Sequence, residues 1–338
     1  MLKKRHCMLA VFLLTMFVFV SCTKTESSNP KNAAYVFQYA HTQSEAHPRS
    51  KSMQFFKSEL ENRSKGKIRV ELYFSGILGK ESETLDMVRT GTIQGCRGGL
   101  FERANKKFLI YTLPFLFEDA QQLESVLDSE FGRSINAGAL ENGFYIPACG
   151  IAGGLRNITT SSKPIQQPLD LVGLRLRTPP IDITIKTFTR LGAITHQIPY
   201  TETYLALQKK IVDGQENPLS NIVDMKFYEV QEYLSLLNWQ AHPDPFYVNP
   251  EWYDSLPKDL QQIFDETAKE TMRYSNTLWL DSENKFLEYL EDKLTTNTVT
   301  AQNLTLFKNA VRPIWDDYIK NGYFTEEDLK TLISLKNE

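Results

Sequence analysis

The chain has 338 residues, of which 41% are hydrophobic and 12% aromatic, a composition that suits a folded protein of about two domains. Its formal charge of −3 at pH 7 argues against nucleic acid as a partner. Its four cysteines form no CxxC pair, and no group of His, Cys and Asp has zinc-ligand spacing, so the sequence predicts no metal site.

The first 22 residues have the order of an export signal. Basic residues at positions 3–5 precede an apolar run over 8–20, which is too short for a permanent membrane span. The VFVSC sequence that ends at Cys22 resembles a bacterial lipobox, with Phe19 where Leu is usual. We therefore expect residues 1–21 to be a signal peptide and Cys22 to become a lipidated N-terminus, with an ordinary export signal as the alternative. Both interpretations place the mature chain outside the cytoplasm.

The segment 22–33 is polar and is expected to be a lipidated tether between membrane and folded domain. Loss of residues 1–21 removes three basic groups and no acidic one, so the formal charge falls from −3 to −6. Two cysteines, Cys96 and Cys149, remain after the tether. We expect them to be two separate buried thiols; the alternative is a disulfide between them, which an oxidising compartment allows.

An α/β unit is predicted for the first half of the mature chain. Alternation of apolar and polar residues indicates strands, and apolar residues at helical spacing indicate helices, in this order: strand 34–39, helix 48–61, strand 68–73 and a helix from the turn at 76–79 to about residue 89. Residues 109–117 are apolar, but Pro114 forbids a regular central strand, so we expect an ordered and buried connection there.

A second α/β stretch begins near Gly153. The expected elements are a strand at 173–177, a helix at 181–191, a strand at 193–198 and a helix that Thr201 caps and Asp213-Gly214 ends. Residues 260–293 contain no Gly or Pro and keep apolar residues at helical intervals, which predicts one long helix or two abutting ones. At about 1.5 Å per residue such a helix reaches roughly 50 Å, so it should span two domains. A helix at 303–321 and a shorter one at 325–335 close the chain.

The sequence lacks the common motifs of catalytic and cofactor-binding sites: it contains no GxSxG, HExxH, GxxxxGK[ST] or GxGxxG. The nearest approach to a phosphate loop is Gly76 to Lys80, where Glu81 replaces the required Ser or Thr. We therefore expect no enzyme, no cofactor and no bound metal.

Two arginines stand in unusual contexts, Arg156 in GGLRNIT and Arg177 in GLRLRTP. Each lies at the edge of a predicted strand beside small residues. A guanidinium group matches a carboxylate with two parallel hydrogen bonds, so both are candidates for binding an acid. Arg175 and Arg177 fall on the same strand face, so alternation alone does not choose between them. A salt bridge on a solvated face is the alternative for each.

The run from Tyr200 to Pro218, YTETYLALQKKIVDGQENP, resembles the signature E-x-Y-x-A-L-Q-x-G-x-V-D-G-Q-E-N-P of DctP-type solute receptors of tripartite ATP-independent periplasmic (TRAP) transporters. Lys210 replaces the usual Gly. The resemblance extends to further segments along the chain: His47-Pro48, Gly76 to Glu83 (G-x-L-G-x-E-x-E), Thr90 to Ile93, Leu113 to Phe117 (LPFLF) and Leu169 to Arg177 (DLxGLKxR).

This resemblance implies a two-domain periplasmic-binding-protein-like α/β fold (type II) with a hinge and a long domain-spanning helix. We expect residues 34–153 with about 242–281 to form domain I, and 154–241 with about 282–338 to form domain II. The resemblance also implies site residues: Arg177 pairs with the ligand carboxylate, Arg156 supports the same group, and Asn217 contacts the ligand through its amide.

Three further residues are weaker ligand candidates. Arg97 lies in GCRGG, where the family commonly has an apolar strand end, and is expected either to add positive charge to the pocket or to lie at the surface. Tyr200 and Phe37 are aromatic residues near the expected cleft, for which a core position is preferred. Glu202 is expected to cap the positive end of its helix rather than to touch ligand.

The expected function is a periplasmic receptor, anchored through Cys22, that captures a small organic acid and delivers it to the small and large TRAP membrane subunits. An accessory soluble or lipoprotein partner is a further candidate. The sequence does not identify the acid: a dicarboxylate, keto acid, sugar acid, or apolar or aromatic acid all fit. The alternatives are an extracytoplasmic enzyme and a structural lipoprotein with a hydrophobic ligand that is not a carboxylate.

Overall fold

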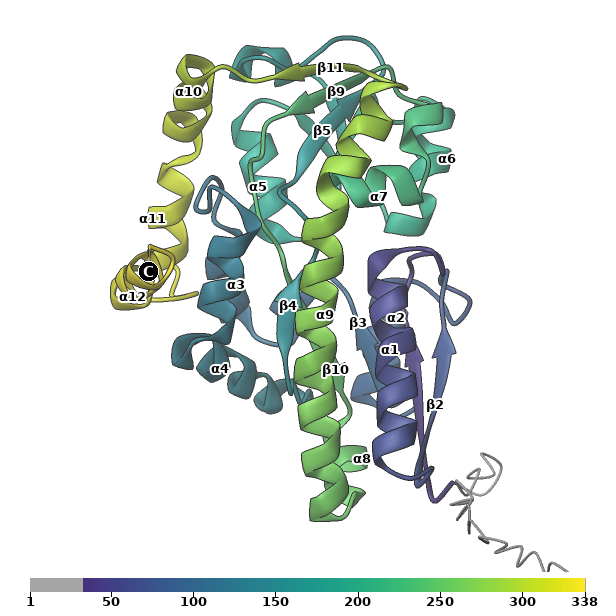
Figure 1. The fold of residues 1–338 in the computed structure, drawn as a ribbon. Coiled ribbons are helices and arrows are strands. Elements are labelled where there is room, and N and C mark those ends of the chain that lie inside the picture. The colour runs from purple at the N-terminus through teal and green to yellow at the C-terminus, as the bar shows by residue number, and fades with distance from the viewer. Residues whose placement is uncertain (1–32, 338) are drawn as a thin grey trace, which may run out of the picture.

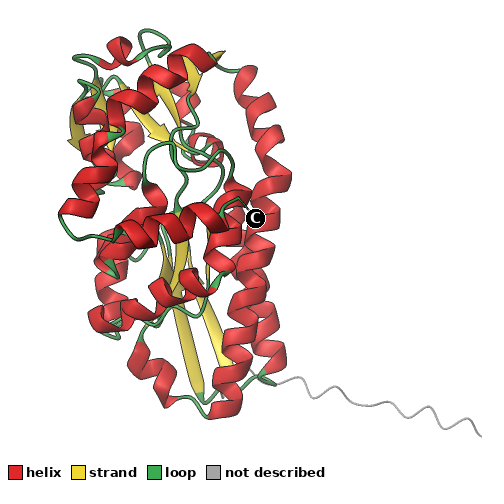
Figure 2. Cartoon of the chain, turned by 90° about the vertical axis from the view of Figure 1, so that its left-hand side faces the viewer, coloured by secondary structure: helices red, strands yellow, loops and turns green. Residues whose placement is uncertain are grey.

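The computed structural model describes residues 33–337, which form two β-sheets with helices packed around them (Figure 1). The predicted signal peptide and Cys22 lie outside the described residues. Figure 2 shows the two groups of strands one above the other, with helices at both sides. Within the described part of the chain, no helix is apolar over a length sufficient to cross a membrane.

The first sheet has the strand order β2-β1-β3-β10-β4. Its members are β1 (Tyr35–Ala40), β2 (Ile68–Tyr73), β3 (Gly95–Arg97), β4 (Cys149–Ile151) and β10 (Pro243–Val248). Strand β1 runs parallel to β2 and β3, whereas β10 is antiparallel to β3 and β4. Cys96 and Cys149 lie on opposite sides of β10 as free, buried thiols, so the disulfide alternative is wrong.

The second sheet has the order β11-β9-β5-β8-β6-β7. Its strands are β5 (Asn157–Thr160), β6 (Arg175–Thr178), β7 (Ile194–Gln197), β8 (Gly214–Asn217), β9 (Tyr233–Leu236) and β11 (Thr295–Thr298). The chain crosses between the sheets after β4, again after β9, and a third time through the long helix α9 (Lys258–Glu291). All strands of the first sheet lie within the residues predicted for domain I, and all strands of the second sheet lie within those predicted for domain II. The domain boundaries themselves stay a prediction.

The helices are α1 (Pro48–Arg63), α2 (Glu81–Arg89), α3 (Ala120–Asp128), α4 (Glu130–Ala137), α5 (Asp182–Arg190), α6 (Thr203–Gln208), α7 (Leu219–Asp224), α8 (Pro250–Ser255), α10 (Ala301–Val311), α11 (Pro313–Lys320) and α12 (Glu326–Leu335). The 34-residue α9 contacts α1 and β4 at one end and α7 and β11 at the other. The predicted domain-spanning helix and the two-sheet α/β fold are therefore confirmed. At the end of the chain, α12 packs against α3 of the first half.

Two predicted helices are wrong in extent. The helix predicted over 303–321 divides into α10 and α11, because Pro313 has no N–H to continue the hydrogen-bond ladder. The helix predicted to run from Thr201 to Asp213 begins with a 3₁₀ turn, and α6 already ends at Gln208. Lys210 follows with φ of +54°, the left-handed conformation that ends many helices and that glycine adopts without strain. This explains why Gly is usual at that position.

Candidate ligand-binding site

A cavity of about 60 Å³ lies where the two halves of the molecule meet. Its wall combines polar side chains from both sheets. Those that matter for binding are Gln43, Arg49 and Glu81 from the first half and Arg156, Arg177 and Asn217 from the second. Three of these six follow or end a strand, since Gln43 comes after β1, Arg177 is near the end of β6 and Asn217 ends β8. Ligands of open α/β folds bind at such carboxyl ends of strands.

Arg177 is a buried cation with a single hydrogen bond. Its side chain lies in β6 at 2% exposure, and its Nε donates to the carbonyl of Ile198 at 2.8 Å. Among residues 33–337, its two amino groups find no hydrogen-bond partner. Burial lowers the pKa of Arg177 to about 10; the charge of Arg156 adds to this effect and that of Glu216 opposes it. A buried guanidinium with free donors is a site that an anion would stabilise.

Arg156 stands just before β5 and lines the same cavity, but its charge is already paired. Its Nε and Nη2 donate to the two carboxylate oxygens of Glu216, at 2.5 and 2.9 Å. Glu216 lies in β8, the strand next to β5, and is completely buried. Arg156 therefore forms a structural ion pair behind the cavity wall, while it still presents donors to the cavity.

Asn217, the last residue of β8, is held in place by its neighbours. Its Oδ1 accepts from Arg156 Nη2 at 3.3 Å and from Asn221 Nδ2 at 3.2 Å, and its Nδ2 donates to Gln215 Oε1 at 2.5 Å. The structure thus brings Arg156, Arg177 and Asn217 together at one cavity, as the family resemblance implies.

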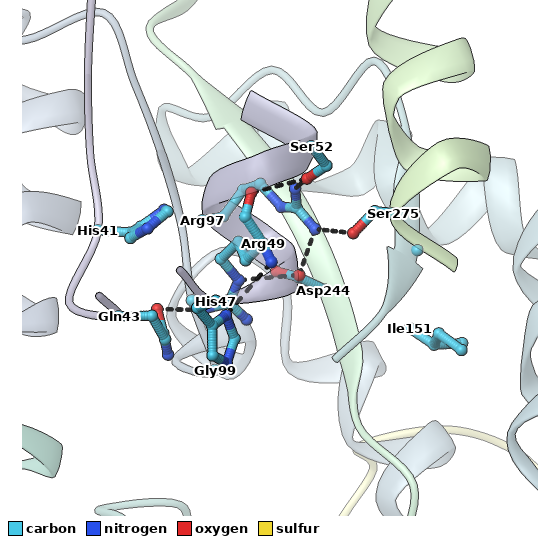
Figure 3. Close-up of polar contacts among 12 residues, drawn as sticks. His41, Gln43, His47, Arg49, Ser52, Arg97, Gly99, Ile151, Asp244 and Ser275 are labelled. Atoms are coloured by element: carbon cyan, nitrogen blue, oxygen red, sulfur yellow. Dashed lines mark hydrogen bonds and ion pairs between the residues drawn. The ribbon is translucent and has the colours of Figure 1, made fainter. Parts of the chain in front are cut away.

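Arg49 is a cavity residue that the sequence analysis did not select. It begins α1, lies at 4% exposure, and donates through Nε to Asp244 Oδ2 at 3.0 Å and through Nη1 to Gln43 Oε1 at 2.8 Å. Figure 3 shows these contacts at the N-terminal end of α1. The signal available in the sequence was its position directly after His47-Pro48, a segment that carried the family resemblance.

Arg97 belongs to the same buried network but not to the cavity wall. It is 2% exposed and donates to Asp244 Oδ2 at 2.5 Å, to Ser52 Oγ at 2.8 Å and to Ser275 Oγ at 3.0 Å (Figure 3). The surface alternative for Arg97 is therefore wrong. Arg97 and Arg49 both donate to Asp244. Arg97 therefore holds in place the carboxylate that orients Arg49.

Glu81, the first residue of α2, places a carboxylate in the cavity wall. Its Oε1 accepts a hydrogen bond from the backbone N–H of Gly99. Burial raises the pKa of Glu81, and the charge of Arg49 and the Gly99 N–H act in the opposite direction. A Cβ on Gly98 would collide with this carboxylate, which explains the glycine at position 98. In the sequence, the segment around Glu81 indicated only the family.

The weaker aromatic candidates differ in position. Phe37 is completely buried in the first half, where its ring packs on those of Phe56 and Phe246, so its core interpretation is confirmed. Tyr200 does line the cavity. Glu202 occupies the N-cap position of α6, as predicted, but its side chain makes no cap hydrogen bond and pairs with Lys80 instead.

Three polar contacts join the two halves beside the cavity. Ser44 Oγ donates to Asp224, His47 Nε2 lies 3.1 Å from Asn221 Oδ1, and Lys80 Nζ lies 2.5 Å from a carboxylate oxygen of Glu202. In each pair the first residue precedes or begins a helix of the first half and the second belongs to the second half. The structure therefore presents the two halves in a closed arrangement around the cavity.

Comparison with known proteins gives a consistent result. The model of the family "Bacterial extracellular solute-binding protein, family 7" matches residues 39–321. The chain is 26% identical to the C4-dicarboxylate-binding periplasmic protein DctP of Vibrio cholerae, over 85% of this chain and 87% of that protein. It is 27% identical to the 2,3-diketo-L-gulonate-binding periplasmic protein YiaO of Escherichia coli, over 86% and 87%.

Among solved structures, a TRAP periplasmic solute-binding protein from Haemophilus influenzae with bound L-gulonate superposes with a TM-score of 0.85. The two chains are 26% identical, and the match covers 89% of this chain and 99% of the other.

Proposed function

The chain belongs to family 7 of the bacterial extracellular solute-binding proteins, the extracytoplasmic receptors of TRAP transporters, and from this premise we propose that it captures a small organic acid through Arg177. The observation that carries the proposal is the buried guanidinium of Arg177, which has one backbone hydrogen bond and lines a cavity between the halves. A carboxylate that leaves water needs a paired charge and saturated hydrogen bonds, and Arg177 supplies both.

The names of the relatives support an acid as ligand. The Vibrio cholerae relative is named for C4-dicarboxylates, the Escherichia coli relative for 2,3-diketo-L-gulonate, and the Haemophilus influenzae structure contains L-gulonate. These compounds differ in length and hydroxylation but each carries a carboxylate. The shared group is the one that Arg177 is suited to bind.

Binding is coupled to closure of the two halves. Arg177 and Asn217 belong to the second half and Arg49 and Gln43 to the first, so a ligand that reaches both walls stabilises only the closed arrangement. Such differential affinity shifts the population toward the closed form. Gly153, with φ of +100°, lies in the crossing after β4, where a glycine tolerates the backbone change of a hinge.

In this proposal the closed, loaded receptor delivers its ligand to the small and large TRAP membrane subunits, and no turnover takes place. The signal peptide over residues 1–21, the lipid anchor at Cys22, the boundaries of domains I and II and an accessory partner are parts of the proposal that rest on the sequence. Globomycin-sensitive processing and labelling of the chain with a radioactive fatty acid would test the anchor.

The binding test is calorimetric titration of the purified protein with a panel of mono- and dicarboxylates, keto acids and sugar acids, repeated with Arg177→Ala. We expect at least one acid to bind and Arg177→Ala to abolish its binding. Arg175→Ala is the matched control, because Arg175 lies two residues away on the same strand and pairs with Asp213 outside the cavity. Equal affinity in the Arg177→Ala variant would contradict the proposal.

A further inference from the structure

A second pocket, which we call the rear pocket, lies beside α9 and the crossing from β4 to β5. Its volume is about 400 Å³, within the range of small-molecule sites. In the crossing, Ala152 and Arg156 line the cavity proposed for the acid. Their neighbours Ile151, Leu155 and Asn157 line the rear pocket instead. The two sites therefore use different faces of one backbone segment and share no lining residue.

The lining of the rear pocket combines an apolar surface with charge of one sign. Its ionisable residues are Glu118, Asp119 and Glu283, and its described lining contains no Lys, Arg or His. Glu118 and Asp119 are exposed just before α3, whereas Glu283 of α9 is partly buried. The apolar residues come from the first half, the second half and α9: Ile151, Leu155, Leu219, Leu236, Leu280 and Leu287. Such a lining suits a cation with an apolar body.

The carboxylate of Glu283 has no counterion in the described part of the chain. Its Oε2 is buried and accepts no hydrogen bond from residues 33–337. The carboxylate lies over Gly154, because a Cβ at that position would collide with both of its oxygens. Burial raises the pKa of Glu283 to about 7, and no cation among the described residues opposes this effect. A cation that brings hydrogen-bond donors would stabilise this buried carboxylate.

A second unpartnered polar group lines the same pocket. Trp279 is 1% exposed, and its indole Nε1 finds no hydrogen-bond acceptor among residues 33–337. It precedes Glu283 by four residues on α9, so the two side chains lie on the same face of the helix. A ligand that fills the pocket can therefore donate to the carboxylate of Glu283 and accept from the indole N–H of Trp279.

We propose that the rear pocket is a second binding site, for a small organic ammonium ion of the amino-alcohol type. Its ammonium group binds Glu283, its hydroxyl oxygen accepts from Trp279, and its apolar chain contacts the leucines. A metal ion is not the expected cation, because no group of three His, Cys, Asp or Glu among the described residues could hold one. The site is independent of the acid receptor function, because Arg177 lies outside its lining.

The test is calorimetric titration at pH 8, where Glu283 is mostly ionised, with four probes that share one branched chain: leucinol, isoamylamine, isohexanol and isocaproate. Leucinol carries both the amine and the hydroxyl, and the others lack one or both. Because a hydrogen bond to a charged group contributes a factor of about 10 to 100, we expect leucinol to bind at least tenfold tighter than isohexanol and isocaproate. Isoamylamine should bind with intermediate affinity.

Glu283→Gln keeps the size of the side chain and removes its charge, so it should weaken leucinol binding about tenfold or more. The matched control is Glu288→Gln, which removes the same charge from an exposed position of α9 outside the pocket and should leave leucinol affinity unchanged. Isohexanol as tight as leucinol, unaltered leucinol affinity in Glu283→Gln, or no binding of leucinol would overturn the proposal. If Glu283→Gln does not fold, the order of the four probes on the unaltered protein decides.

Discussion

Replacement of Arg177 by methionine should weaken ligand binding and at the same time stabilise the unliganded protein. Burial lowers the pKa of this guanidinium from its ordinary value to about 10, so the folded state disfavours its charged form by about 3 kcal/mol. Methionine has a similar volume and removes the uncompensated charge. The lost hydrogen bond from Nε to the Ile198 carbonyl costs about 1 kcal/mol. The free energy of unfolding should therefore rise by about 2 kcal/mol.

The effect on binding has the opposite sign. Loss of one partner of a buried charge pair costs about 2–5 kcal/mol, which corresponds to a fall in affinity of about 30-fold to 4,000-fold. Urea unfolding measures the first effect and calorimetric titration the second. Since the pKa of about 10 in the folded state and the higher ordinary pKa both lie above pH 8, the stabilisation should be constant from pH 5 to 8.

Arg175→Met is the control for this experiment. Arg175 is half-exposed and paired with Asp213, so its replacement should neither stabilise the protein nor weaken binding. A variant Arg177→Met that is less stable than the parent and binds its ligand normally would show that the guanidinium is structural and that its charge is compensated.

Three other substitutions have definite expected outcomes. Asp244→Asn leaves two buried arginines without their shared carboxylate, so it should lower the free energy of unfolding, measured by urea titration, by about 3–5 kcal/mol. Its control is Asp213→Asn, which removes the carboxylate of a half-exposed ion pair and should leave the free energy of unfolding nearly unchanged. Lys80→Met removes an exposed ion pair between the halves and should weaken ligand affinity by less than about fivefold, an effect that high salt abolishes. Lys210→Gly removes the strain of a left-handed backbone conformation at position 210, so it should raise the unfolding temperature. A lower unfolding temperature in this variant would contradict the strain argument.

The sequence predicted those features that depend on local pattern. Alternation located β1 and β2 of the first sheet and β6 and β7 of the second, and the absence of Gly and Pro between 260 and 293 predicted α9. The remaining strands were not predicted: β3, β4, β5, β8, β9, β10 and β11. The family resemblance placed Arg156, Arg177 and Asn217 in one site. The local pattern gave two helices the wrong extent, because neither Pro313 nor the left-handed Lys210 was recognised as marking a helix end.

The first wall of the cavity could not be predicted because its partners are far apart in the chain. Arg49 and Arg97 meet at Asp244, which follows them by 195 and 147 residues. Nothing in the sequence around Arg97 indicates a buried carboxylate in β10, the strand beside β3, so the sequence allowed only a pocket position or a surface position for Arg97. The contact of Glu81 with Gly99 likewise depends on how α2 packs beside β3.

Arg156 and Arg177 differ in the neighbours that the second sheet gives them. Asn157, next to Arg156, pairs with Asn217, and Ile158 pairs with Glu216, so a carboxylate of β8 lies within reach of Arg156. Arg177 pairs with His196 on one side and Gln215 on the other, and neither supplies a negative charge to it. The register of β8 thus gives one arginine its counterion and leaves the other to the ligand. A change that moved a carboxylate to position 215 would supply that counterion internally, and Gln215→Glu should therefore compete with the ligand acid for Arg177.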